Sequence, residues 1–225
     1  MKASMPPFKI IDLTHNITPT MPVHPYDNPI SLKKTRSLEY DHYNDWTLCS
    51  GMHVGTHIDG PGHLTNSPIL LSDLPADRFV GRGVLIDARP KTQDLTGEQN
   101  LTLKIDTALL ENIPNEEPPI VLIMTEWDKK YHSPDYFNAH PIISPETARK
   151  FVEKGIKMIG IDFFSPDYYP FEVHQILLEA GILIIENLKN LEQLIGITNF
   201  TIIALPLKTE TDSSLARVIA LQTTP

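Results

Sequence analysis

Four side chains that can bind a cation or transfer a proton lie within one short stretch: His53, His57, Asp59 and His63. Two neutral imidazole nitrogens and one carboxylate oxygen form a common ligand set for a catalytic divalent cation, with positions left for water. A further imidazole titrates near neutral pH and can pass protons. The spacing therefore predicts an open catalytic metal site. The alternative is that these histidines lie in a polar loop and bind nothing.

The backbone must bend for these side chains to meet. Residues four apart in a straight strand are roughly 13 Å apart, close to the limit for two imidazoles to reach one ion. Gly55 and the Gly-Pro-Gly turn at 60–62 argue against a helix. We therefore expect a bend near Gly55 that brings His53 and His57 together. The turn should then return His63 to the edge of the site, where it suits proton transfer.

A second pair, His174 and Glu186, lies at a predicted helix and at the end of the strand that follows it. A helix that returns to a strand through a single glycine turn can place both residues at one edge of a sheet, where ligands often bind. Taken alone, the pair is better explained as a helix-surface histidine and an ordinary acidic residue. The other histidines are expected on the surface or in supporting roles: His15, His24, His42, His132 and His140.

The elements that would position these residues alternate between helix and strand only in the second half of the chain. Residues 144–155 have strong helix signals, with Ser144 as N-cap, Pro145 in the first turn and Gly155 past the end. This pattern predicts an α/β protein with a mixed sheet. Residues 14–45 are expected to be loop with short extended pieces. Strands are expected at 8–13, 46–59 (interrupted), 83–88, 119–125, 156–162, 182–187, 200–208 and 216–222, and further helices at 102–112, 172–181 and, briefly, 190–196.

Composition limits the classes of function. The chain has 225 residues and a net charge of −9, with no basic stripe for phosphate contacts, so we expect one domain over 1–225 and no nucleic-acid partner. No segment is apolar enough over the length needed to span a membrane. Cys49 is the only cysteine, which fits a reducing cytoplasm, and we expect it to be a small buried thiol.

The stretch His53-Val-Gly-Thr-His57-Ile-Asp59-Gly-Pro-Gly-His63 resembles the HxGTHxDxPxH signature of the cyclase family of metal-dependent hydrolases, which includes bacterial kynurenine formamidase and isatin hydrolase. Further pieces resemble family motifs in the same order along almost the whole chain. These are IDLTH at 11–15, TEW at 125–127, GIDxxS at 160–165, HQILL at 174–178, IENL at 185–188 and ALPL at 204–207.

The resemblance implies a swivelling β/β/α fold with a mixed β-sheet core and flanking helices, in a homodimer or homotetramer. It also implies one or two divalent ions, zinc or in some members manganese. By position, His53, His57 and Asp59 match the ligands of one ion, and His174 and Glu186 those of a second. His63 matches the catalytic histidine.

The function we expect is hydrolysis of a carbon–nitrogen amide bond in a small molecule, with an aryl formamide as substrate. N-formylkynurenine, which gives kynurenine and formate in tryptophan catabolism, is the named candidate. Metal-activated water would attack, and His63 would act as acid and base. Trp46, Phe163 and Phe164 are candidates for substrate binding, and Tyr168 and Tyr169 could line the same aromatic pocket, although core packing is the ordinary role of such residues.

Two alternatives stay open. One is opening of a cyclic imide, lactam or lactone, as isatin hydrolase does; the other is a non-catalytic metal-binding assembly protein. The chain also departs from the family pattern at Gly60, where many members have Ala, at Leu64, where many have Phe, and at 212–217, where the Gly and Pro of a DGSPxR element are missing. These departures leave the identity of the substrate open.

Overall fold

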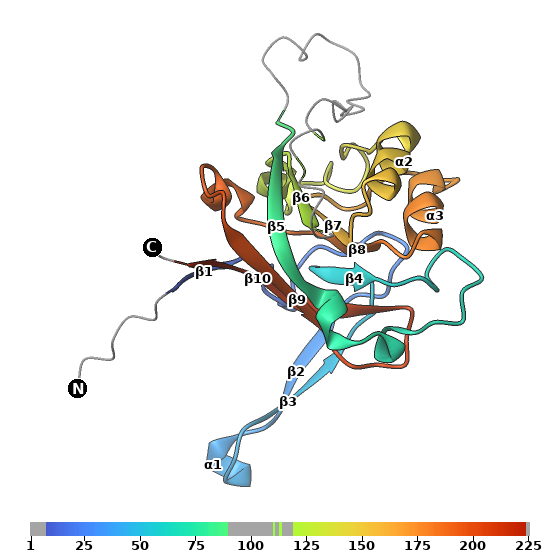
Figure 1. Cartoon of the computed structure of the whole chain (residues 1–225). Coiled ribbons are helices and arrows are strands. Elements are labelled where there is room, and N and C mark those ends of the chain that lie inside the picture. The colour runs from blue at the N-terminus through green and yellow to red at the C-terminus, as the bar shows by residue number, and fades with distance from the viewer. Residues whose placement is uncertain (1–7, 90–109, 111–112, 114–118, 224–225) are drawn as a thin grey trace.

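The computed structural model describes residues 8–89, 110, 113 and 119–223 (Figure 1). The helix expected at 102–112 lies almost wholly outside these residues. The strands are β1 (Phe8–Asp12), β2 (Ser31–Arg36), β3 (Asp45–Cys49), β4 (His57–Asp59), β5 (Val80–Asp87), β6 (Ile120–Met124), β7 (Met158–Ile161), β8 (Leu183–Glu186), β9 (Phe200–Pro206) and β10 (Ser213–Thr223). The α-helices are α1 (Leu38–Asp41), α2 (Pro145–Glu153) and α3 (Glu172–Glu179).

Eight of these strands form one mixed sheet that curls back on itself. The order is β1-β10-β4-β8-β7-β6-β5-β9, and β9 also pairs with β10, which closes a ring. Strands β5, β6, β7 and β8 are mutually parallel, whereas β4, β9, β10 and β1 join by antiparallel pairing. The expectation of a mixed sheet is confirmed.

The parallel strands are buried on both faces, so their side chains feed two hydrophobic cores. In β6, Val121 and Ile123 pack with residues of α2 and α3, such as Phe151 and Leu177. The alternate residues of β6 face the other way, into a core shared with β1, β9 and β10. Side chains of a strand alternate between its faces. The sheet is therefore a layer between a helix-covered core and the core inside the ring.

Helix α2 begins as the sequence signals predict, and both helices that flank the sheet end as they predict. The Ser144 hydroxyl accepts a hydrogen bond from the Thr147 backbone amide at the start of α2. Gly155 and Gly181 follow α2 and α3 in the left-handed conformation, with φ of 64° and 75°. These ends fix where α3, and with it His174, lies on the sheet.

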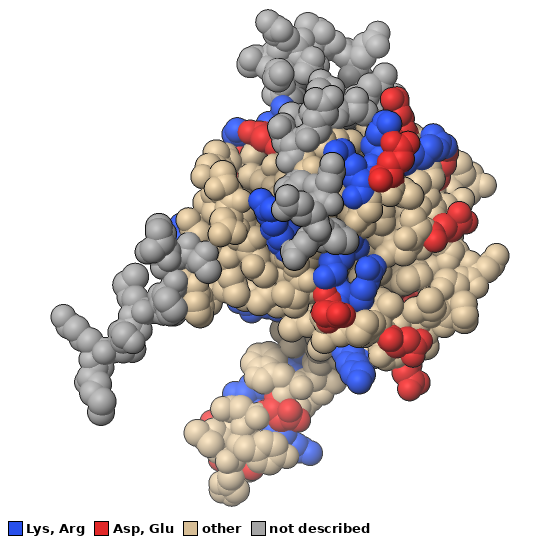
Figure 2. Space-filling view, viewed as in Figure 1, with Lys and Arg blue, Asp and Glu red and all other residues tan. Residues whose placement is uncertain are grey.

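The segment 14–45 is mostly loop with short regular pieces, as expected, and β2, which lies within it, pairs with β3 in a hairpin that projects from the rest of the molecule (Figure 1). The strands of the hairpin are largely exposed. Cys49, at the end of β3, is exposed too, so the expectation of a small buried thiol was wrong. Acidic and basic side chains are interspersed on the face shown in Figure 2. Over the part of the chain that the structure describes, none of the helices has the length and apolarity to cross a bilayer.

Candidate metal centre

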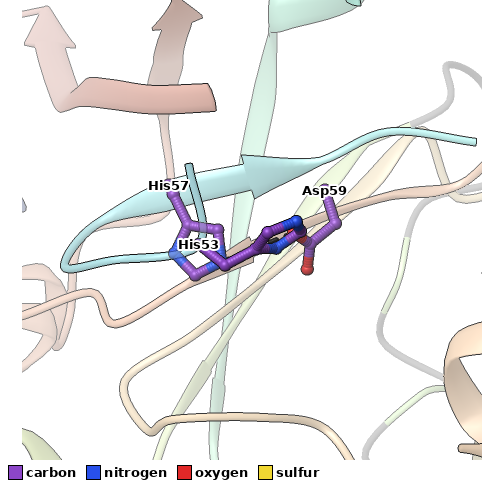
Figure 3. Close-up of side chains that lie close together, drawn as sticks. All are labelled: His53, His57 and Asp59. Atoms are coloured by element: carbon purple, nitrogen blue, oxygen red, sulfur yellow. Dashed lines mark ion pairs between the residues drawn. The ribbon is translucent and has the colours of Figure 1, made fainter. Parts of the chain in front are cut away.

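The predicted bend lies at Gly55, and it brings His53 and His57 together. Gly55 has a φ of 62°, a left-handed conformation that L-residues adopt at a cost. A Cβ atom added at Gly55 would lie 2.7 Å from the Met21 Cε atom. Ligand atoms of His53, His57 and Asp59 all lie within 4.8 Å of one another. Figure 3 shows the three side chains extending to the same side of β4.

Strand β4 places His57 and Asp59 two residues apart on one face, and its neighbour β8 adds Glu186. His57 is directly opposite Glu186 in the antiparallel pairing of β4 with β8. The His57 Nε2 atom lies 3.4 Å from Asp59 Oδ1 and 3.4 Å from Glu186 Oε2. All three residues are buried. These three members of the centre are thus held by the sheet rather than by a loop.

His174 reaches the same centre from the first turn of α3. Its Nε2 atom lies 3.5 Å from Glu186 Oε1 and 3.9 Å from Asp59 Oδ2. His174 is buried, and its Nδ1 atom lies 2.5 Å from Asp167 Oδ1. His57 and His174 are far apart in the sequence, yet both lie next to the carboxylates of Asp59 and Glu186.

His63 lies at the edge of this cluster, after the Gly60–Gly62 turn. The His63 amide donates to the Gly60 carbonyl at 3.1 Å, which closes the turn. Its ring centroid lies 3.9 Å from that of His53 and 5.7 Å from that of His174. Its Nδ1 atom lies 3.3 Å from Asp212 Oδ2. The sequence did not single out Asp212 as a partner of His63.

The hydrogen bonds of the cluster show that it fits a cation. His57 Nδ1 donates to the Gly55 carbonyl at 2.8 Å, so the neutral ring presents a lone pair at Nε2. Among the described residues, neither that Nε2 atom nor either Asp59 oxygen has a hydrogen-bond partner, although all three are buried. The nearest imidazole nitrogen to Asp59 is His53 Nδ1, 2.8 Å from Oδ1. Buried nitrogen and oxygen atoms that face one another in this way are costly unless a cation or a proton lies between them.

The electrostatics of the cluster also favour positive charge. Although burial lowers it, the nearby Asp59 carboxylate raises the pKa of His57 to about 9. Burial opposes ionisation of Asp59 too, yet the His57 imidazole holds its pKa well below the usual range. Burial lowers the pKa of His63, which keeps this ring neutral and able to accept a proton at neutral pH.

A cavity of about 490 Å³ opens beside the cluster and has aromatic walls. Of the five aromatic residues proposed from sequence, three line it: Phe164, Tyr168 and Tyr169. Phe163 is buried in the core, and Trp46 is exposed on β3 in the projecting hairpin. The cavity residues that sequence reasoning missed come from several loops and from the start of α3: His24, Asp27, Phe137, Asn138, His140, Asp167 and Phe171.

Two aspartates that end strands have structural partners. Asp162 accepts hydrogen bonds from the Thr125 amide, the Thr125 hydroxyl and the Glu126 amide at 2.6 to 2.8 Å. Asp12 pairs with the exposed Arg217 guanidinium, with oxygens 2.7 and 3.0 Å from its nitrogens. Asp162 therefore fixes the turn after β6, and Asp12 joins β1 to β10.

Comparison with known proteins agrees with this geometry. Residues 11–168 match the Cyclase family, which is more than half of the chain. The chain belongs to the Cyclase family. The resemblance to this family of metal-dependent hydrolases, which the sequence motifs indicated, is confirmed. The prediction that the chain is an enzyme is confirmed as well.

Relatives with established names match over nearly their full length. A kynurenine formamidase from Bacillus mycoides is 30% identical, with 93% of this chain and 95% of the relative covered. A kynurenine formamidase from Salinibacter ruber is 28% identical, with 88% and 90% covered. Among solved structures, isatin hydrolase A from Labrenzia aggregata has a TM-score of 0.82 at 26% identity, with 97% and 95% covered. The predicted swivelling β/β/α fold is confirmed by this likeness.

Proposed function

We propose that this Cyclase-family enzyme is a metal-dependent amide hydrolase that cleaves an aryl formamide, with N-formylkynurenine as the named substrate. The observation that carries the proposal is the cluster of buried, unpartnered acceptors at His57 and Asp59 beside a cavity with aromatic walls. The substrate class is supported by the kynurenine formamidases that match almost the whole chain. An aromatic ring would pack against cavity residues such as Phe164.

In this proposal, His53, His57 and Asp59 hold one divalent ion, and His174 and Glu186 contribute to a second. Nitrogen and oxygen ligands of this kind suit zinc, with manganese as the alternative. A bound cation of this kind polarises a carbonyl oxygen and lowers the pKa of water. The metal content per chain distinguishes one bound ion from two.

His63 is proposed to move the proton. Asp212 accepts from His63 Nδ1, which leaves Nε2 of the neutral ring free to take a proton from the attacking water. The same nitrogen then delivers that proton to the leaving nitrogen of the amide. His63 lines the cavity, so its ring is within reach of a bound substrate.

The test combines removal of the cation with removal of the proton-transfer group. Chelation should abolish turnover of N-formylkynurenine, and Zn²⁺ or Mn²⁺ should restore it. His63→Ala should lower kcat by about 10²- to 10⁴-fold with unchanged metal content. His132→Ala, which removes an exposed imidazole, is the matched control and should retain full activity. Full activity of the chelated protein, or of His63→Ala, would refute the proposal.

A second candidate is opening of a cyclic lactam, because isatin hydrolase A shares the fold over 97% of this chain. The same residues would act on an internal amide bond. Parallel turnover assays on N-formylkynurenine and isatin separate the two substrates. Bound metal without hydrolysis of either substrate, or of a broad panel of amides and lactones, would instead support the non-catalytic alternative.

We also propose that the enzyme is a homodimer or homotetramer located in the cytoplasm. The projecting β2–β3 hairpin supports association, since it exposes large apolar side chains that a lone chain would leave in water. These are Leu38, Tyr40, Tyr43, Trp46 and Leu48. Sedimentation equilibrium measures the assembly state directly, and a mass of one chain would contradict this part of the proposal.

A further inference from the structure

Asp167 is a buried carboxylate that belongs to none of the ligand sets above, and its two oxygens have different partners. Its Oδ1 atom lies 2.5 Å from His174 Nδ1. Its Oδ2 atom accepts from the Val173 amide at 2.6 Å and from the His174 amide at 3.4 Å. Asp167 is only 6% exposed. One side chain therefore joins the ring of His174 to the backbone that carries it.

The contact with the two amides caps helix α3 from outside. The first amides of a helix have no partner within it, and a side-chain oxygen at the N-cap usually accepts from one of them. Here the N-cap residue is Phe171, at a φ of 62°, which has no side-chain oxygen to offer. Asp167 supplies the missing acceptor, and its negative charge is favourable at a helix N-terminus.

The contact with the ring fixes which nitrogen of His174 carries the proton. An ionised carboxylate only accepts hydrogen bonds, so His174 Nδ1 must donate to Asp167. In the neutral ring, Nε2 then keeps its lone pair. That nitrogen faces Glu186 Oε1 at 3.5 Å and Asp59 Oδ2 at 3.9 Å. The ring is thus held in the tautomer and orientation that a cation ligand needs.

The segment that carries Asp167 is itself held in place. The Ser165 hydroxyl donates to the Asp167 carbonyl at 2.9 Å. The Pro166 carbonyl accepts from the Ile143 amide at 2.8 Å, next to the start of α2. The backbone that carries the carboxylate is therefore fixed by one hydrogen bond within residues 165–167 and by one to the residue before the N-cap of α2.

We propose that Asp167 is the positioning residue of the metal centre: it locks His174 to the first turn of α3 with Nε2 directed at Asp59 and Glu186. This inference rests on the proposed metal-dependent function and adds to it a residue outside the ligand set. Second partners of this kind typically contribute 10- to 100-fold in metal affinity.

The test uses the full chain and Zn²⁺ alone, measured by competition with a chromophoric chelator. Asp167→Ala should weaken Zn²⁺ binding by about 10- to 100-fold, and Asp167→Asn is the milder variant if Asp167→Ala does not fold. Ser144→Ala is the matched control, because it removes the corresponding cap of the neighbouring helix α2 without touching His174. It should bind Zn²⁺ like the wild type.

A second readout separates positioning from a purely structural role and needs no metal. In the chelated protein, the Nδ1–H proton of His174 should exchange slowly with solvent in the wild type, because it is hydrogen-bonded to the buried Asp167, and fast in the Asp167 variant. Wild-type Zn²⁺ affinity with an equally protected Nδ1–H proton in the Asp167 variant that folds would overturn the inference, as would an equal loss of affinity in Ser144→Ala. If the wild type binds no Zn²⁺ yet shows the protected Nδ1–H proton, the proposed function fails and the positioning role stands.

Discussion

Gly55→Ala tests the bend on which the metal centre depends. The φ of 62° at Gly55 is open to glycine and strained for alanine, and the new Cβ would lie 2.7 Å from Met21 Cε. The left-handed conformation costs an L-residue about 1 to 2 kcal/mol. Displacing the flexible end of Met21 adds a smaller amount. We expect the free energy of unfolding of the Zn²⁺-bound protein to fall by about 1 to 3 kcal/mol.

The same strain should appear in the affinity for the cation. The metal-free chain can release the strain by opening the bend, whereas a bound cation holds His53 and His57 together. The bound state therefore carries a cost of about 1 to 2 kcal/mol that the free state escapes, which corresponds to about 5- to 30-fold weaker binding.

Gly155→Ala provides the matched control. Gly155 has nearly the same φ, 64°, but no described atom lies within 4 Å of a Cβ added there. Both variants should unfold at lower urea concentration, while only Gly55→Ala should lose Zn²⁺ affinity in a chelator competition. Equal Zn²⁺ affinity in Gly55→Ala, Gly155→Ala and the wild type would refute the claim that this bend gathers the ligands.

Two further substitutions test the turn and the cavity wall. Gly60→Ala would place a methyl group 2.8 Å from both the Asp212 carbonyl and Leu71 Cδ2, so the free energy of unfolding in urea should fall by about 1 to 3 kcal/mol; an unchanged midpoint would show that the turn has room. Burial lowers the pKa of His140 from 6.5 to about 4. Between pH 6.5 and pH 4, His140 is therefore protonated in the unfolded chain but not in the folded chain. Stability should therefore be lost as the pH falls from about 6.5 to about 4. His140→Asn can still donate to the Pro141 carbonyl, and its stability should differ less between pH 7 and pH 5; an equal difference contradicts this reasoning.

The parts of the fold that the sequence predicts are those with strong local signals. Helix α2 has a capping serine, an early proline and a closing glycine, and each is in its expected place. Most of β3 falls in the stretch 46–59 that was expected to be extended, whereas β2 and its pairing with β3 were missed. Both faces of β2 are largely exposed, so no alternation of apolar and polar residues marks it as a strand.

The site divides in the same way. The spacing of the residues predicted the bend at Gly55. Asp212 lies far along the chain from its partner His63, and Asp167 lies close to His174 but in no recognisable pattern. In both cases only the fold reveals the contact. His24 and His140 reach the cavity wall on separate loops, for which a single sequence offers no signal. The structure therefore adds supporting residues more than ligands.

Strand β10 has a consequence for the order in which the protein can mature during synthesis. Its first residues, Ser213–Leu215, pair with β4, and its later residues complete the ring with β9. During synthesis β4 is made long before β8 and β10. The strand that carries His57 and Asp59 is therefore not fully paired until both neighbouring strands have been made. High cation affinity should therefore be acquired late, only after β10 has left the exit tunnel, and nascent chains that stop before Ser213 should lack it.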